Sequence, residues 1–373
     1  MMIKVLFLTQ NLGGGGAEKV LVNLVNNLDK DKFDVTVKTI FDGGVNKDKL
    51  KPDVKYVCRN KKLRRGISRI YSFVSPKTLY KDIVGKEDYD IVVAYMHGIP
   101  TRVLLGAPKG VRKIAWLHSG DMSKISLFKC FITKRSAIKA MKKFDAIVGV
   151  SQTVSDNFSA YTGIKNNVCT CYNTNETEEI ILLAKENVDL SSIKKPIICS
   201  VGRFTPEKGF SRLIDISKRL NEEGFTHSLM LLGDGPLRKD LEQKVNEMGY
   251  GDVYFAGYQK NPYAYMSHAD MFVCSSYYEG LSTATTEAVI LGLPCVSTDV
   301  SGAREILTED SQGIVVENND DALYDGIKQM IEKINQGKID YAKIRRSADK
   351  FTVQNTVKKV EELFESILDN KGE

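Results

Sequence analysis

Short apolar runs alternate with segments of helical periodicity along the whole chain, and this alternation constrains the fold more than any other feature. Apolar runs of four to six residues predict buried β-strands, and apolar residues recurring every three to four positions predict helices. Such alternation is typical of parallel sheets covered by helices on both faces, so the sequence predicts an α/β protein with doubly wound parallel sheets. The expected strands are Lys4–Leu8, Val35–Ile40, Ile91–Tyr95, Ile114–Leu117, Ala146–Val150, Ile197–Val201, Leu229–Leu232, Val253–Phe255, Met271–Cys274, Cys295–Thr298 and Gly313–Val316. The expected helices are Ala17–Leu28, Gly209–Leu220, Pro236–Met248, Thr283–Leu291, Asp320–Ile334 and Thr352–Leu368.

The strands form two series, separated by the polar and acidic stretch Asn173–Lys195. The balance of charge changes sign at the same place: residues 1–175 carry 30 Lys and Arg against 14 Asp and Glu, whereas residues 176–373 carry 23 against 33. We therefore expect one domain at 1–175 and a second at 176–351. Residues 352–373 are expected to form an amphipathic helix that crosses back to the first domain. Ligands of such sheets bind beyond the carboxyl ends of the strands, which places the expected site in a cleft between the domains.

Four consecutive glycines, Gly13–Gly16, lie between the first expected strand and the first expected helix. Glycines let a ligand approach the backbone closely, and the start of a helix offers unpaired N–H groups to an anion. The spacing does not match the dinucleotide motif G-x-G-x-x-G, because Glu18 occupies the third glycine position, and it does not match the P-loop motif. Nicotinamide dinucleotides and P-loop phosphoryl transfer are therefore disfavoured, while an anion site and a plain flexible turn both remain open.

Two further motifs follow strands in the second half of the chain. Residues 202–209, GRFTPEKG, place Arg203 and Lys208 where two cations can neutralise a diphosphate, although charges on a surface loop are an equal alternative. Residues 279–287, EGLSTATTE, place one carboxylate in a loop and another about one turn into the next helix. A loop carboxylate can accept hydrogen bonds from sugar hydroxyls, and amides at a helix start can hold a phosphate.

Together these motifs resemble the large family of retaining glycosyltransferases with the GT-B fold, commonly numbered family 4. The resemblance also includes LLGDGPLR at 231–238, FAGY at 255–258, the continuation of EGLSTATTE to residue 307, and GIVVENNDDAL at 313–323. It implies two Rossmann-like domains facing across a cleft. The N-terminal domain would bind the acceptor and the C-terminal domain the nucleotide-sugar donor.

The resemblance also implies roles for matching residues of the second domain. Arg203 and Lys208 would contact the donor diphosphate, and Glu287 would hold the ribose. Tyr258 would border the base. Glu279 would position the donor sugar and phosphate together with the three residues after it, Gly280, Leu281 and Ser282.

In the first domain, the resemblance implies that Gly15 and Gly16 approach the donor from across the cleft. His118 follows the expected strand Ile114–Leu117 in WLHSGD, where the family often has a histidine that reaches the donor sugar; without the resemblance, a structural histidine is the simpler interpretation. His118, Arg203, Lys208 and Glu279 are the expected catalytic residues.

No metal or other cofactor is expected. Cleavage of the sugar–phosphate bond places negative charge on the leaving diphosphate, and fixed donors aimed at that charge lower the barrier. Arg203 and Lys208 would do what a divalent metal does in other transferases. Two D-x-D strings, Asp29–Asp31 and Asp88–Asp90, precede strands and so lie at the end of the sheet away from the expected site.

The excess positive charge lies in residues 51–150, with 22 Lys and Arg against 7 Asp and Glu. In the stretches 61–86 and 124–144 these cations alternate with Leu, Ile, Phe and Tyr, a composition that suits an anionic bilayer surface. A solvated basic face is the alternative. No nucleic-acid motif appears, so a nucleic-acid partner is not expected.

The sequence thus predicts a retaining, metal-independent glycosyltransferase that moves a hexose or N-acetylhexosamine from a nucleotide-sugar, UDP-linked by family frequency, to a lipid-linked glycan of bacterial surface polysaccharide synthesis. No run of about 18 apolar residues exists, so we expect a cytoplasmic protein peripheral to the inner face of the plasma membrane. A soluble acceptor is one alternative function. A catalytically silent partner of another transferase is a second.

Overall fold

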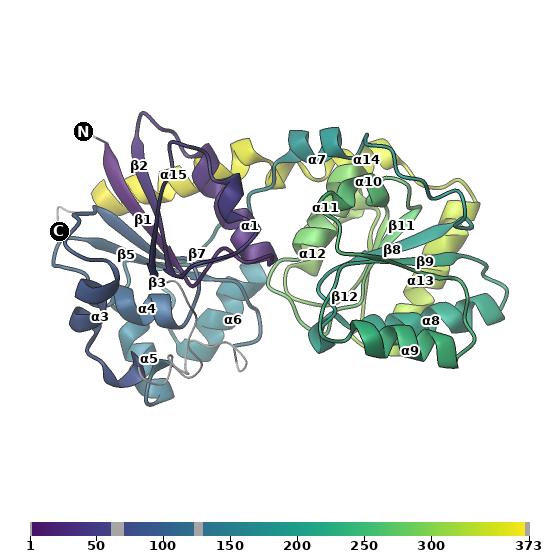
Figure 1. Ribbon diagram of the computed structural model, residues 1–373, viewed down its shortest axis with the longest axis horizontal. Helices are drawn as coiled ribbons and strands as arrows, with labels where there is room; N and C mark the ends of the chain where they lie inside the picture. Colours follow the sequence, from purple (N-terminus) through teal and green to yellow (C-terminus); the bar gives the residue numbers. More distant parts are fainter. Residues whose placement is uncertain (1, 61–70, 123–129, 370–373) are drawn as a thin grey trace. The chain divides into compact units, whose positions relative to one another are not determined.

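The computed structural model describes residues 2–60, 71–122 and 130–369, and the chain folds as two compact units (Figure 1). The first unit comprises Met1–Asn175 together with Val353–Glu373, and the second comprises Glu176–Thr352. Each unit has one parallel sheet with helices between its strands, so the predicted α/β class with doubly wound sheets is confirmed. Of the two basic stretches, residues 61–70 and 124–129 lie outside the described residues.

The sheet of the first unit has seven strands in the order β3-β2-β1-β4-β5-β6-β7. All neighbouring strands pair in parallel, which brings the carboxyl ends of β1, β4 and β5 side by side at one edge. The two outermost strands, β3 and β7, were not predicted, because a sheet-edge strand needs no continuous apolar run. The strands are β1 (Ile3–Thr9), β2 (Phe33–Phe41), β3 (Lys55–Asn60), β4 (Ile91–Ala94), β5 (Arg112–Leu117), β6 (Ala146–Gly149) and β7 (Val168–Thr170).

Helices of the first unit cover its sheet, and the last of them comes from the far end of the sequence. The Phe364 ring of α15 (Val353–Asp369) lies 6.1 Å from the Phe7 ring and 5.8 Å from the Phe33 ring, between centroids. The Glu361 carboxylate accepts a hydrogen bond from the Asp29 backbone N–H at 2.7 Å. The other helices are α1 (Gly16–Asn27), α3 (Pro76–Ile83), α4 (Ile99–Leu104), α5 (Lys134–Met141) and α6 (Gln152–Thr162), with a 3-10 turn η1 (Lys47–Lys49).

The second unit has a six-stranded parallel sheet in the order β10-β9-β8-β11-β12-β13. Its core packs apolar residues of the strands against α8 and α13, with Leu213, Val273 and Ile327 fully buried. The strands are β8 (Ile197–Val201), β9 (Ser228–Leu232), β10 (Val253–Gly257), β11 (Met271–Cys274), β12 (Cys295–Thr298) and β13 (Ile314–Val316). The helices are α7 (Thr177–Leu183), α8 (Phe210–Glu222), α9 (Arg238–Glu247), α10 (Pro262–Met266), α11 (Thr283–Leu291), α12 (Ala303–Ile306), α13 (Asp320–Asn335) and α14 (Tyr341–Arg346), with 3-10 turns η3 (Pro206–Lys208), η4 (Glu309–Ser311) and η5 (Asp349–Phe351).

Within the ranges that the structure describes, no helix is both long enough and apolar enough to cross a bilayer. The two D-x-D strings lie at the amino ends of strands, as the sequence predicted. Asp29 and Asp31 precede β2, and the Asp90 carboxylate accepts a hydrogen bond from the Lys4 backbone N–H at 2.9 Å beside β4.

Candidate functional site

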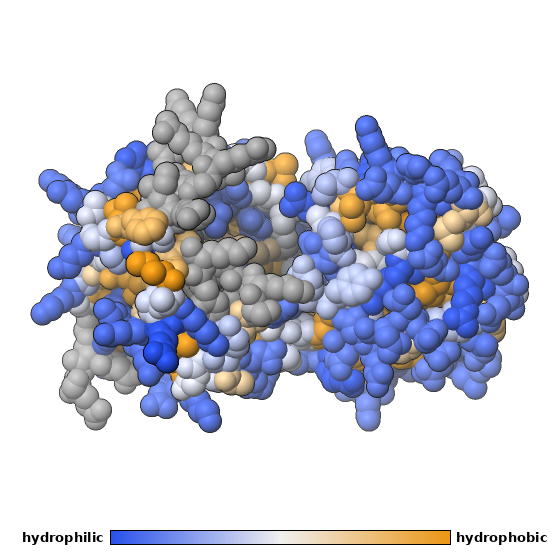
Figure 2. All heavy atoms as spheres, turned by 90° about the horizontal axis from the view of Figure 1, so that it is seen from below, coloured by the Kyte–Doolittle hydropathy of each residue, from blue (hydrophilic) through white to orange (hydrophobic). Residues whose placement is uncertain are grey.

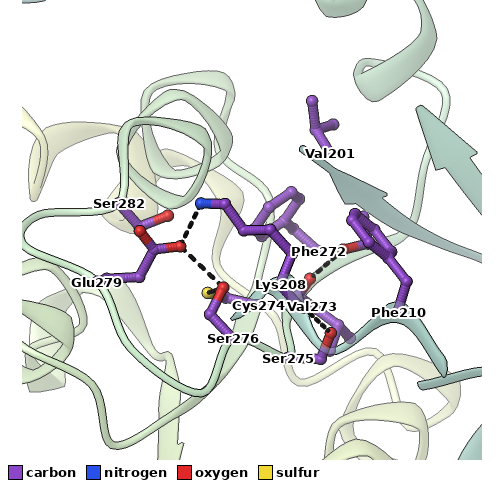
Figure 3. Close-up of a pocket in the computed structure, with 11 residues that line it drawn as sticks. Val201, Lys208, Phe210, Phe272, Val273, Cys274, Ser275, Ser276, Glu279 and Ser282 are labelled. Carbon is purple, nitrogen blue, oxygen red and sulfur yellow. Dashed lines mark hydrogen bonds and ion pairs between the residues drawn. The ribbon is translucent and has the colours of Figure 1, made fainter. Parts of the chain in front are cut away.

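A small pocket in the second unit contains two of the predicted catalytic residues as an ion pair (Figure 3). Lys208 ends the turn η3 after β8, and Glu279 lies in the loop after β11, the neighbouring strand. The Lys208 Nζ atom is 2.6 Å from Glu279 Oε1, and the Ser276 hydroxyl donates to the same oxygen at 2.8 Å. Only 28% of the lysine side chain and 13% of the glutamate side chain are exposed. The loops after two adjacent parallel strands therefore place a cation and a carboxylate at one point.

The neighbouring carboxylate favours the charged form of Lys208. Burial alone would lower the pKa of the Lys208 ammonium, but the Glu279 carboxylate outweighs that effect and holds the pKa above its usual value. In a partly buried setting the charge–charge attraction is much stronger than in water. The ammonium is thus fixed as a positive charge at the carboxyl end of β8.

The backbone holds the two loops against each other around this pair. The Tyr277 N–H donates to the Glu207 carbonyl at 2.8 Å, and the Ser275 hydroxyl donates to the Lys208 carbonyl at 2.9 Å. Gly209, with φ of +66°, lies so close that a Cβ there would overlap the Ser275 carbonyl oxygen. A glycine is required here both for its left-handed conformation and for this close approach.

The helix α11 begins beside the pocket. The Ser282 side chain caps it by accepting from the Thr285 N–H at 3.2 Å, and its first turn carries the partial positive charge of a helix N-terminus. Gly280 and Leu281 precede the cap and are buried. Glu287 follows one turn later and is 5% exposed, with Tyr263 donating to its Oε1 atom at 3.2 Å. Lys208, Glu279 and Ser282 thus line one pocket, whereas Glu287 lies outside its lining.

Two other predicted residues of this unit are not brought into the pocket. Arg203 directly follows β8, and its exposed side chain makes no hydrogen bond or ion pair with the rest of the described chain. Tyr258 directly follows β10, two strands away from β8, and is 58% exposed. Both lie at the carboxyl edge of the sheet, where a ligand larger than the pocket would reach them.

In the first unit, the predicted residues lie at the carboxyl edge of the β1–β4–β5 strands. Gly15 caps the N-terminus of α1, which begins at Gly16 directly after the loop that follows β1. His118 directly follows β5. Its ring centroid lies 4.7 Å from that of Tyr95, and its buried Nε2 atom has no hydrogen-bond partner among the described residues.

A second histidine, His97, was missed by the sequence reasoning. It follows β4, the strand beside β5, and its buried Nδ1 atom also lacks a partner among the residues that the structure describes. The sequence contained a signal for this residue. His97 lies three residues after β4, and His118 directly follows β5, so both histidines come just after an apolar strand. Burial, with the nearby His97 as a smaller cause, lowers the pKa of His118 to about 3, and burial lowers the pKa of His97 to about 4. Both rings are therefore neutral at physiological pH.

A histidine of the second unit shows what a structural histidine looks like in this protein. His227 is fully buried, but its Nε2 lies 2.7 Å from the Ser217 hydroxyl and its Nδ1 lies 2.7 Å from the Phe225 carbonyl. Buried polar atoms are nearly always paired in this way. The buried Nδ1 of His97 and Nε2 of His118 depart from this pattern within the described chain.

Two units, each with one parallel sheet and helices between its strands, have the Rossmann-like architecture of a GT-B glycosyltransferase. Family models match both units: "Glycosyltransferase Family 4" matches residues 14–179, and "Glycosyl transferases group 1" matches residues 184–350. The chain belongs to the family 4, group 1 glycosyltransferases, as the sequence resemblance predicted.

Relatives cover the chain to different extents. It is 26% identical over 362 residues to the N-acetylgalactosamine-N,N'-diacetylbacillosaminyl-diphospho-undecaprenol 4-alpha-N-acetylgalactosaminyltransferase of Campylobacter jejuni, covering 91% of this chain and 93% of the relative. It is 36% identical over 155 residues to an uncharacterized glycosyltransferase of Methanocaldococcus jannaschii, covering 40% of this chain but 38% of that relative.

Solved structures share the fold over almost the whole chain. Anabaena HepE in complex with UDP-glucose matches with a TM-score of 0.77 and 20% identity, covering 98% of this chain and 100% of HepE. Sucrose-phosphate synthase from Thermosynechococcus elongatus matches with a TM-score of 0.79 and 16% identity, covering 99% of this chain and 100% of the synthase. At these identities the likeness concerns the fold alone.

Proposed function

We propose that this glycosyltransferase moves a hexose or N-acetylhexosamine from a UDP-sugar to a lipid-linked glycan, with retention of the anomeric configuration. The observation that carries the proposal is the partly buried Lys208–Glu279 pair, 2.6 Å apart beside the N-terminus of α11. A cation, a hydrogen-bond-accepting carboxylate and a helix start at one sheet edge are the groups that bind a sugar diphosphate. The C. jejuni relative, by its name, acts on a diphospho-undecaprenol-linked acceptor, which supports the choice of acceptor.

The chemistry follows from where charge develops. The bond from the anomeric carbon to the diphosphate oxygen breaks with its electron pair on the oxygen, and an acceptor hydroxyl forms the new bond to that carbon and passes its proton to the leaving diphosphate. Lys208 and Arg203 stabilise the leaving diphosphate, and Glu279 orients the sugar through its hydroxyls. Because Glu279, itself held by the Ser276 hydroxyl, already fixes the Lys208 ammonium, little reorganisation is needed as charge develops.

The proposal includes metal independence, since Lys208 and Arg203 supply the positive charge at the diphosphate. We expect full activity in EDTA. Strict loss of activity in EDTA with rescue by Mn²⁺ would contradict this part of the proposal and leave the transfer itself intact.

The acceptor's membrane anchor gives a role to a basic surface of the first unit. Arg135, Lys139 and Lys142 line one side of α5 together with Ile138. Ile132, which precedes α5, is 77% exposed. Figure 2 shows strongly hydrophilic and hydrophobic side chains next to one another on the face of this unit that it views. Cations beside exposed apolar side chains suit an anionic bilayer.

A second exposed side chain lies near Ile132. Arg102 donates to the carbonyls of Ser72 and Val74 at 2.7 and 2.9 Å, and its guanidinium lies 5.5 Å from the centroid of the Phe131 ring. The same arginine therefore joins the backbone on either side of Phe73, which is 75% exposed, to the residue before Ile132. These two side chains are the most exposed large apolar residues of the described chain, as expected of anchors that enter a bilayer interface.

The test is a donor and acceptor screen of the full chain. UDP-, GDP- and ADP-sugars are compared by thermal shift, and a ligand at 100 times its Kd stabilises the fold by about 2.7 kcal/mol. The stabilising donor is then incubated with a polyprenyl-diphosphate-linked disaccharide, and the product anomer is assigned by NMR. Transfer with retention is expected. Transfer to a soluble sugar but not to the lipid-linked one, or donor binding without any transfer, would overturn the proposal.

A further inference from the structure

Arg212 is a deeply buried charge that neither the sequence motifs nor the proposed chemistry uses. It lies in the first turn of α8, and 3% of its side chain is exposed. Arginine is among the residues least often buried, because removing its charge from water is costly unless the charge is paired and its donors are satisfied. The partners of this guanidinium therefore indicate what it is retained for.

Most of those partners belong to the loop that leads to Glu279, and the charge itself is paired with the exposed Asp320 carboxylate of α13, 3.6 Å from Nη1. Arg212 donates to the Ser275 carbonyl from Nε at 2.9 Å and from Nη2 at 2.6 Å, and Nη2 also donates to the Ser276 carbonyl at 2.9 Å. The guanidinium carbon lies 3.9 Å from the centroid of the Tyr277 ring. One planar side chain thus contacts three consecutive residues of the loop after β11.

Asn318, between β13 and α13, completes the arrangement from the other side. Its Oδ1 accepts from Arg212 Nη2 at 2.8 Å, while its Nδ2 donates to the Tyr277 carbonyl at 2.9 Å and to the Ser276 carbonyl at 3.4 Å. The Thr298 hydroxyl at the end of β12 donates to the Ser276 carbonyl at 2.6 Å. The carbonyls of residues 275–277 are therefore fixed by side chains from three separate elements.

The same three loop residues hold the ion pair. Ser276 donates to Glu279, Ser275 donates to the Lys208 carbonyl, and the Tyr277 N–H donates to the Glu207 carbonyl (Figure 3 shows the first two contacts). A shift of the loop backbone would therefore move Lys208 and Glu279 together. Arg212 lies two residues after Phe210, which lines the pocket from the same helix, and is itself absent from the pocket wall.

We propose that Arg212, with Asn318, is a positioning residue for glycosyl transfer: its forked guanidinium fixes the backbone of residues 275–277 and thereby the geometry of the Lys208–Glu279 pair. This inference rests on the proposed function. A misplacement of catalytic groups by about 1 Å costs about 100-fold in rate, which sets the expected size of the effect. The fork is essential, because a lysine ammonium cannot donate to Ser275, Ser276 and Asn318 in one plane.

The experiment compares Arg212→Lys, Arg212→Met and Arg212→Ala with the matched control Arg219→Ala in the full chain. Arg219 is on the same helix, 4.0 Å from the Tyr324 ring centroid and paired with Glu223 at 3.1 Å, but it does not contact the 275–277 loop. We expect kcat to fall about 100-fold in all three Arg212 variants, with KM for the donor changed less than threefold. Arg219→Ala should keep the wild-type kcat. Millimolar guanidinium should restore part of the kcat of Arg212→Ala and leave the control unchanged.

Hydrogen exchange at the Tyr277 amide gives a readout that needs no turnover. The amide should exchange faster in the Arg212 variants and at the wild-type rate in Arg219→Ala. A wild-type kcat in Arg212→Lys or Arg212→Met would overturn the proposal, as would an equal fall in Arg219→Ala. Absence of transfer by the wild-type chain would instead refute the proposed function. The exchange experiment would still decide whether Arg212 fixes the backbone of residues 275–277. If Arg212→Ala does not fold, Asn318→Ala decides it, with an expected fall in kcat of about tenfold and no fall if the proposal is wrong.

Discussion

The two units share an architecture but differ in how the polar groups at their sheet edges are satisfied. In the second unit the charges pair with each other, since Lys208 contacts Glu279 at 2.6 Å and a network of serines and Arg212 holds both. In the first unit the edge presents the buried nitrogens of His97 and His118, which have no partner among the described residues. The charged groups of the second unit thus hold one another in place, whereas these two histidine nitrogens of the first unit have no such contact within the described chain.

The two units also differ in net charge. The first unit, residues 1–175 and 353–373, carries 33 Lys and Arg against 19 Asp and Glu, and the second, residues 176–352, carries 20 against 28. The acidic part nevertheless places Lys208 in a pocket and Arg203 beside it, exposed. A local arrangement of cations, rather than net charge, is what suits a diphosphate, whereas an extended basic surface suits a bilayer.

The largest expected effect concerns the preorganised site. Replacing Lys208 (Lys208→Ala) should lower kcat/KM about 100- to 1,000-fold, because one fixed donor to the leaving group is lost. The matched control is Lys244→Ala, which removes a 29% exposed lysine paired with Asp215 at 2.5 Å in the same unit. Steady-state kinetics with the donor found by the screen measures both. An equal loss in the two variants would show that breaking either ion pair of the second unit lowers the activity, and that Lys208 has no specific role at the leaving group.

The second prediction concerns the unpaired histidines. Their pKa values, about 3 for His118 and about 4 for His97, lie below the 6.5 of an unfolded histidine. The unfolded state therefore binds more protons as pH falls below 6.5, so stability decreases from pH 7.5 to pH 5. The loss should be about 2 kcal/mol per histidine.

Urea unfolding at the two pH values measures this effect. His118→Gln should lose about 2 kcal/mol less than the wild type between pH 7.5 and pH 5, and His97→Gln should behave alike. A wild-type pH dependence in both variants would mean that these rings accept protons in the folded state.

The smallest expected effect concerns the basic surface. Arg135→Gln and Lys139→Gln should each weaken binding to anionic vesicles about fivefold, because each cation near such a surface contributes about 1 kcal/mol. Lys239→Gln, an exposed lysine on α9 of the second unit, is the control and should bind like the wild type. Co-sedimentation with phosphatidylglycerol vesicles measures the change. Equal recovery with neutral vesicles would show that the charge difference between the units has no role at a membrane.

The sequence predicted the central strands and the loops that carry the site residues. It did not predict which side chains contact one another. The strands β8, β11 and β12 have the predicted bounds, because buried central strands are continuous apolar runs. The family resemblance implied that Lys208 and Glu279 contact one donor, and the structure places both in the lining of one pocket. Spacing did not reveal that the two pair with each other, since that depends on the register between β8 and β11 and on a hydroxyl from Ser276.

Arg212 and Asn318 lay beyond prediction for a related reason. They are 106 residues apart in the sequence and meet only because β11, β12 and β13 end side by side. Arginine and asparagine do not by themselves indicate a buried position. In the sequence alone, Arg212 is an ordinary polar residue of an amphipathic helix. His97 was different, because its place after an apolar run could have identified it.

The position of α15 has a consequence for how the chain folds during its synthesis. The core of the first unit includes the Phe364 ring, which packs against the rings of Phe7 and Phe33. Residues 7 and 33 are therefore buried by a residue more than 300 positions later in the sequence. During synthesis the second unit has all its residues before the first can bury these rings. Nascent chains should therefore expose the rings of Phe7 and Phe33 until α15 has been synthesised. A chain that stops before residue 353 should have a native second unit and a first unit that is a substrate for chaperones and proteases.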